Sequence, residues 1–129
     1  MILRIWSATL LLARLEEYRR FEAERSLPML HRQPGFLGVF FLRATEDRAA
    51  SITIWEDRGA VEALKSSPSY RRTDRELADS GLLLAGESSV KILEVEGGDL
   101  RPEALVGILA ERGAPVLRVR RRRVPAIDG

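Results

Sequence analysis

The sequence of 129 residues contains no cysteine. This absence excludes a disulfide framework, a thiolate metal site and a cysteine nucleophile. A single histidine, His31, is too few for a histidine-rich metal centre, so we expect no metal site. No glycine-rich phosphate loop and no serine triad pattern is present. The composition leaves carboxylates, phenols, guanidinium groups and one imidazole as the candidate reactive groups.

Long hydrophobic runs are also missing. No stretch approaches the ~20 apolar residues of a membrane-spanning helix. The apolar N-terminal segment is interrupted by Arg4 and shows no small-residue cleavage site of the kind that ends a signal peptide. We therefore expect a cytoplasmic protein with no membrane partner.

Charge is distributed unevenly along the chain. Residues 118–129 hold five arginines and one aspartate, whereas residues 1–117 hold 16 basic and 18 acidic residues. The arginine run at 118–123 would attract phosphates, but it lacks interleaved aromatic residues and any nucleic-acid-binding motif. We interpret it as a solvated extension or a charged edge strand, and we expect no nucleic-acid partner.

The spacing of apolar residues predicts the element order β-α-β-β-α-β. We expect strands at 2–9, 36–43, 49–55 and 88–96, with a polar turn at 44–48. We expect helices at 11–25, 58–66 and 67–80, and a helical turn at 26–32 begun by Ser26 and Pro28. Asp57 and Ser67 are the expected N-caps, and Glu22 is placed on the solvent face of the first helix. This order is typical of an α+β, ferredoxin-like fold with a four-stranded antiparallel sheet and both helices on one face.

Gly97-Gly98 is the expected domain boundary. It separates a domain at 1–96 from an extension at 97–129, in which Pro102 to Arg112 reads as a short helix and 115–124 as an arginine-rich extended segment. In the last strand of the domain the apolar phase shifts between Ile92 and Leu93, which indicates a bulge or burial of both strand faces.

The hairpin at 34–55 is apolar on both of its faces. Alternation places Phe36, Phe40 and Leu42 on one face with Gly38, and Leu37, Val39 and Phe41 on the other. In the second strand Ile52 and Ile54 point away from Ser51, Thr53 and Trp55. Because an antiparallel hairpin normally shows water a polar side, we expect a second copy of the chain to cover the face that the helices leave open. The predicted partner is thus the chain itself, in a homodimer.

The chain resembles the antibiotic biosynthesis monooxygenase (ABM) family of the dimeric α+β barrel superfamily over residues 1–96. The resemblance rests on the Leu27-Pro28 step, PGFLGVFFLR at 34–43, SITIWED at 51–57 and the Ser-Pro-Ser-Tyr sequence at 67–70. It implies a homodimer with a pocket between sheet and helices in each protomer. It also implies oxidation of a small aromatic or polyketide-like molecule by oxygen, with no metal, flavin or other cofactor.

A haem-degrading sister group uses an asparagine, a tryptophan and a histidine, and the corresponding positions here are Ser7, Leu64 and Asp74. The resemblance therefore disfavours haem degradation.

Two residues are candidate catalytic bases. His31 ends the first helical region near an expected pocket mouth, and a neutral imidazole accepts a phenolic proton near pH 7. Asp74 shares a helix face with Tyr70 and Leu77, and a buried carboxylate there would have a raised pKa suited to a base. The alternatives are a surface histidine and an aspartate paired with a neighbouring arginine.

Four residues are candidate substrate-binding groups: Arg4, Trp6, Trp55 and Tyr70. Indole rings stack on a flat aromatic substrate, and an arginine beside them stabilises a phenolate. The alternative for both tryptophans is packing in the core or at the dimer interface. A non-catalytic, ligand-binding or stress-related dimer of the same fold is the second functional hypothesis, and a pocket filled by its own side chains would favour it.

Overall fold

The computed structural model describes residues 1–84 and 86–111. The chain divides into one compact unit, Met1–Gly98, and a second, Asp99–Gly129. In the second unit the structure describes one helix, α5 (Pro102–Glu111). The arginine-rich segment predicted at 115–124 lies outside the described residues.

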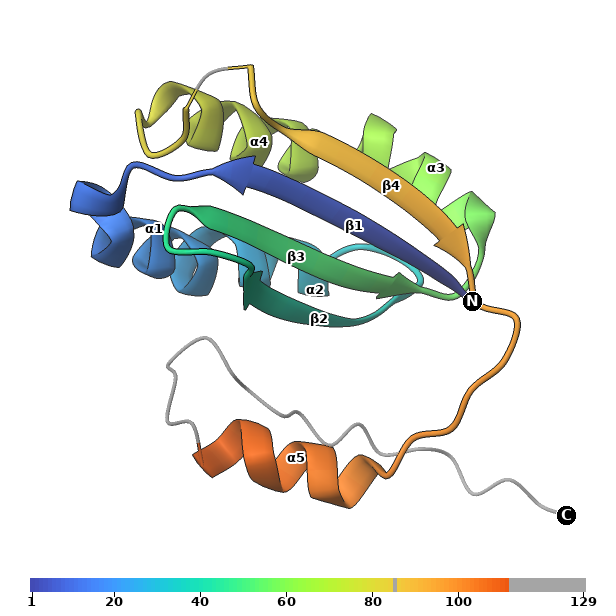
Figure 1. The fold of residues 1–129 in the computed structure, drawn as a ribbon. Coiled ribbons are helices and arrows are strands. Elements are labelled where there is room, and N and C mark those ends of the chain that lie inside the picture. The colour runs from blue at the N-terminus through green and yellow to red at the C-terminus, as the bar shows by residue number, and fades with distance from the viewer. Residues whose placement is uncertain (85, 112–129) are drawn as a thin grey trace, which may run out of the picture. The chain divides into compact units, whose positions relative to one another are not determined.

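The first unit is built on a four-stranded antiparallel sheet. Its strands are β1 (Ile2–Thr9), β2 (Phe36–Arg43), β3 (Arg48–Trp55) and β4 (Ser89–Glu94), in the order β2-β3-β1-β4. The helices lie on one face of this sheet, α1 and α2 behind the β2–β3 half and α3 and α4 behind the β1–β4 half (Figure 1). The predicted ferredoxin-like α+β fold is confirmed.

The first helical region is continuous rather than divided. A 3₁₀ turn (Leu12–Arg14) leads into α1 (Leu15–Phe21), a π-helical turn η2 (Glu22–Ser26) and α2 (Leu27–His31). The prediction that Ser26 caps a new helical turn is wrong, because Ser26 has helical backbone angles and its side chain accepts no capping hydrogen bond. The π turn keeps the backbone hydrogen-bonded where the helix changes pitch.

The second helical region is capped as predicted. The Asp57 carboxylate accepts the Ala60 N–H at 2.8 Å and begins α3 (Arg58–Ser66). The Ser67 hydroxyl accepts the Tyr70 N–H at 3.3 Å and begins α4 (Pro68–Asp79). These caps satisfy helix N–H groups that otherwise lack partners.

A bulge in β2 corrects one predicted strand face. The β2–β3 register shifts between Phe36 and Gly38, so Phe36 pairs with Trp55 and packs in the core beneath the helices. The prediction that Phe36 shares a face with Phe40 and Leu42 is therefore wrong. One extra residue in a strand reverses the direction of every side chain before it.

Strand β4 also differs from the prediction. It pairs with β1 in an unbroken register from Ser89 to Glu94, and every one of its residues is exposed. Neither the bulge nor the burial inferred at Ile92 and Leu93 is present. Plain alternation places Ile92 and Leu93 on opposite faces, and their exposed fractions of 40% and 48% show that neither face is covered there.

The core consists of two separate clusters between sheet and helices. The first contains Ile2, Met29, Leu30, Trp55, Val61 and Leu64, with Tyr70 packed against it. The second contains Leu10, Tyr18, Ala49 and Leu82, with Trp6, Phe21 and Leu77 packed against it. Residues from both clusters face each other across the space between them.

Candidate functional site

A cavity lies between the two core clusters, bounded by the sheet and by both groups of helices. It offers about 80 Å³ to the centres of water-sized molecules. Its lining comprises Arg4, Trp6, Tyr18, Phe21, Ser26, Met29, Leu30, Phe41, Ser51, Thr53, Leu64, Tyr70, Thr73, Asp74 and Leu77. A volume of ~10–15 Å³ by this measure holds one water molecule, so the space takes several waters or a small organic ring.

Arg4 and Tyr70 form a polar pair in this cavity. The Arg4 guanidinium donates a hydrogen bond to the Tyr70 hydroxyl at 2.9 Å, and its carbon lies 5.6 Å from the centre of the Tyr70 ring. No carboxylate forms an ion pair with Arg4 in the part of the chain that the structure describes. A half-buried cation without a counter-charge favours an anionic ligand.

The floor of the cavity is fixed by a hydrogen-bonded pair on β3. The fully buried Trp55 donates its indole N–H to the Thr53 hydroxyl at 2.8 Å, and Thr53 donates to the Arg4 carbonyl at 3.3 Å. Thr53 and Trp6 line the cavity, whereas Trp55 is not part of its lining. Trp55 thus contacts the wall of the cavity from behind.

Asp74 lines the cavity together with Tyr70 and Leu77, the three residues expected on one face of α4. The premise that Asp74 is buried is wrong, because its side chain is exposed. Tyr70 and Leu77 on this face pack against the core clusters, whereas Asp74 lies at its exposed edge. Asp74 therefore lies at the rim of the cavity, in contact with solvent.

His31 lies apart from these residues. It is exposed at the end of α2, and its ring contacts Phe36 edge-on at 5.3 Å between ring centres. Phe36 in turn packs on Trp55 at 5.7 Å. Four of the six predicted site residues, Arg4, Trp6, Tyr70 and Asp74, are thus together in one cavity, while His31 and Trp55 are outside its lining.

The sequence interpretation missed Tyr18 and Glu22. Tyr18 is buried and lines the cavity, and Glu22, expected on the solvent face, is only 8% exposed. Burial, partly offset by Arg19 and Arg43, raises the pKa of Glu22 to about 8. Burial and then the charge of Glu22 raise the pKa of Tyr18. The available signal was the spacing of four residues, which places Glu22 one turn from Tyr18 on the same helix face.

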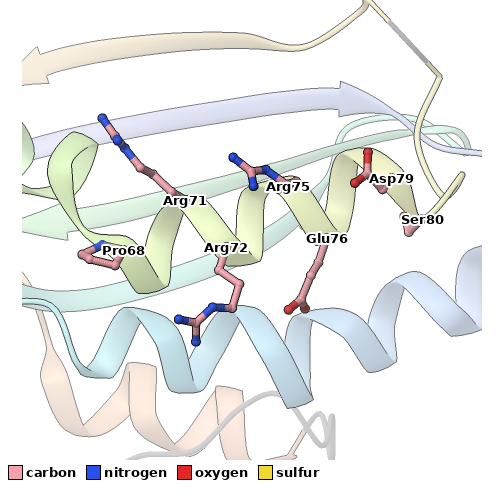
Figure 2. A pocket seen from close by; sticks show the side chains of 7 residues that line it. All are labelled: Pro68, Arg71, Arg72, Arg75, Glu76, Asp79 and Ser80. Carbon is pink, nitrogen blue, oxygen red and sulfur yellow. The ribbon is translucent and has the colours of Figure 1, made fainter.

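A second and larger hollow, of about 550 Å³, lies on the outer side of α4. Figure 2 shows Arg71 and Arg75 projecting to one side of the helix, and Arg72 and Glu76 to the other. Glu76 accepts a hydrogen bond from Arg25 at 2.8 Å. Because one solvated helix surface supplies all of its lining residues and no predicted site residue takes part, we place the candidate site in the inner cavity.

Residues 1–84 and 86–111 contain neither a metal-binding cluster nor a membrane-spanning helix. No group of three or more histidine, aspartate or glutamate side chains is positioned to hold a metal ion. No helix there is long and apolar enough to cross a membrane.

Comparisons with known proteins identify the family. Residues 9–76 match the family model described as antibiotic biosynthesis monooxygenase. A search of curated proteins finds no match.

Solved structures share the fold at low identity. SnoaB, a cofactor-independent oxygenase from Streptomyces nogalater, is 19% identical, with 75% of this chain and 94% of that chain covered and a TM-score of 0.57. The ActVA-Orf6 monooxygenase of Streptomyces coelicolor, solved with nanaomycin D, is 16% identical, with coverages of 78% and 91% and a TM-score of 0.63. NE2512 of Nitrosomonas europaea, a protein of unknown function, is 14% identical, with coverages of 78% and 93% and a TM-score of 0.62.

The likeness to these structures establishes the fold, while the family model spans more than half of the chain, from the end of β1 into α4. The chain belongs to the antibiotic biosynthesis monooxygenase family.

Proposed function

We propose that this protein is a cofactor-independent monooxygenase that acts on a small aromatic, polyketide-like phenol. The observation that carries the proposal is the Arg4–Tyr70 pair, a guanidinium without a carboxylate partner in the described chain, inside a cavity walled by aromatic rings. Such a site holds a phenolate oxygen by charge and its ring by stacking.

The reaction converts a phenol with a free para carbon, or an anthrone-like compound, into a quinone. Loss of the phenolic proton gives a phenolate, which donates electrons from the para carbon to O₂. A C–O bond forms there, the O–O bond then breaks, one oxygen atom remains as the new carbonyl and the other leaves as water. The two hydrogens lost from the substrate appear in that water, so the ring supplies all four electrons that reduce O₂.

Each lining group has a role in this sequence. Asp74 at the rim is the proposed base that takes the phenolic proton. Arg4, oriented by Tyr70, stabilises the phenolate, because a preorganised cation favours the charged form that reacts with oxygen. Trp6, together with Phe41, supplies an aromatic surface for the ring.

The cavity volume bears on substrate size. Pockets for drug-sized ligands have volumes of ~300–1,000 Å³, whereas this cavity offers about 80 Å³. A phenol with one ring therefore fits better than a tricyclic compound unless side chains such as Tyr70 rotate outward.

Oxygen uptake by the chelator-treated protein tests the proposal, with single-ring para-unsubstituted phenols and an anthrone as substrates. We expect uptake above buffer with a single-ring phenol, and Asp74→Asn to reduce it by ~10²- to 10⁴-fold, as removal of a positioned base does. His31→Ala is the comparison variant, because His31 lies outside the cavity lining. A loss confined to His31→Ala would reassign the base to His31.

The second candidate is a non-catalytic, small-ligand-binding protein of the same fold. The small cavity volume favours it, since much of the space is filled by the protein's own side chains. Phenol binding without oxygen uptake by the wild type would establish this alternative.

A further inference from the structure

Glu22 occupies an unusual place for a carboxylate. It is 8% exposed, it begins the π-helical turn, and it follows Tyr18 by one helical turn. Tyr18 and Ser26, the residues four positions before and after it, both line the cavity. Glu22 is therefore on the face of this helical segment that points toward the sheet and the cavity.

Both polar tips reach open space. Among the described residues, no side-chain nitrogen or oxygen is sealed from water and also without a hydrogen bond. The Tyr18 hydroxyl and the Glu22 carboxyl make no hydrogen bond within that part of the chain, so each keeps contact with space that a water molecule can enter. Tyr18 forms part of the cavity wall, so its side chain is within reach of a ligand bound there.

Two arginines act on Glu22 electrostatically, and Glu22 in turn acts on Tyr18. Arg19 belongs to the same helical segment as Glu22, and Arg43 belongs to β2, two residues after the cavity-lining Phe41. Neither arginine is within ion-pair distance of Glu22 in the described residues. Burial outweighs their attraction and favours the neutral acid, which is a hydrogen-bond donor.

We propose that Tyr18 and Glu22 form a proton-donating end of the cavity, which hydrogen-bonds an anionic oxygen of the ligand at the side away from the Arg4–Tyr70 pair. Tyr18 contacts the ligand, and Glu22 acts through Tyr18 as a positioning residue. The two polar ends fall in different core clusters, Tyr70 beside the first and Tyr18 in the second, so a ligand ring spans the space between them.

For turnover this inference rests on the proposed function. Attack of the para carbon on O₂ leaves a peroxide anion, and a proton is needed on its outer oxygen before the O–O bond breaks. The para C–H bond then breaks as hydroxide leaves, and the para proton converts that hydroxide into water. Tyr18 donates the proton to the outer oxygen and recovers one from Glu22 through water in the space that both side chains reach, and the Glu22 carboxylate is reprotonated from solvent. The proton that Asp74 removed from the substrate returns to solvent at the rim, so the cycle balances.

Binding of 4-nitrophenolate, followed by its absorbance, tests the site without any need for turnover. Between pH 7 and pH 9.5 the wild-type affinity for the phenolate form should fall at least fivefold, because ionised Glu22 repels it. Glu22→Gln, which keeps shape but cannot ionise, should hold its affinity within twofold over that range. Tyr18→Phe should weaken binding about tenfold at pH 7, the size of one hydrogen bond to a charged group.

Glu24→Gln is the matched control, because Glu24 is exposed on the same π turn and should reproduce the wild-type profile. Three results would each overturn the proposal. They are a Glu22→Gln profile that superimposes on the wild type, wild-type affinity in Tyr18→Phe, and no wild-type binding at millimolar 4-nitrophenolate.

If the wild type consumes oxygen, Glu22→Gln should lower kcat at least tenfold with KM within threefold. If it consumes none but the binding profiles differ as expected, the oxygenase proposal fails and this binding end stands.

Discussion

Glu22 links the cavity to the pH dependence of folding. Its pKa is raised from 4.5 to about 8 in the folded protein, mainly by burial. Between these values the unfolded chain has released the proton and the folded chain still holds it, so stability is lost as pH rises. The loss is about 1.4 kcal/mol per pH unit across that window.

Glu22→Gln should remove this dependence. We expect its free energy of unfolding, from urea titrations at pH 5, 6.5 and 8, to exceed the wild-type value by a margin that grows with pH. The exposed Glu24→Gln should show no such trend. A constant difference between Glu22→Gln and wild type at all three pH values would contradict the burial argument.

The residues of the candidate site were only partly predictable from the sequence. Arg4, Trp6, Tyr70 and Asp74 were identified because strand alternation and helix spacing place side chains on a face. Glu22 was missed because its stretch of sequence is rich in charges, although the four-residue spacing from Tyr18 places it on the inner face of the helix. Trp55 was recognised as important but not as the support of Thr53, since a hydrogen bond between side chains two residues apart depends on rotamers.

At the scale of elements, caps and periodicity predicted α3, α4 and three of the four strands closely. The bulge at Phe36–Gly38 was not predictable from alternation, because the extra residue is specified by the junction that precedes β2. In that junction Gly35 has φ 77°, and its carbonyl accepts the Glu56 N–H at 2.9 Å. Gly35 thus fixes where β2 begins.

Gly35→Ala should therefore destabilise the fold strongly. A Cβ there would lie 2.6 Å from the Ala60 Cβ, and the positive φ disfavours any L side chain. Strain and overpacking together predict a loss of about 2–4 kcal/mol in urea unfolding followed by circular dichroism. Gly97→Ala is the control, because a Cβ at Gly97 meets no atom within 4 Å, and its effect should stay within about 0.5 kcal/mol. Equal effects of the two substitutions would refute this role for Gly35.

At the scale of the whole molecule, the main feature to explain is the apolar outer face of the sheet. Within the described part of residues 1–98, no helix packs on it (Figure 1). Pairing in the sheet aligns Ile5, Ile52 and Phe40 across three strands at its centre, and Leu3, Ile54 and Leu93 beside them. A continuous apolar surface of this kind marks an interaction site on a soluble protein. The sequence predicted this face from the two-sided hairpin.

We expect a homodimer in which two such faces pack together. Light scattering at micromolar concentration should give twice the 14.5 kDa mass of one chain. Ile52→Lys places a charge at the centre of the face and should shift the protein to monomer, because an unpaired charge buried in an interface costs several kcal/mol. Ala63→Lys on the exposed surface of α3 is the control and should leave the dimer intact. A wild-type mass of one chain would refute the dimer. A dimer that survives Ile52→Lys would move the interface to another surface, and the outer sheet face would then need a different partner.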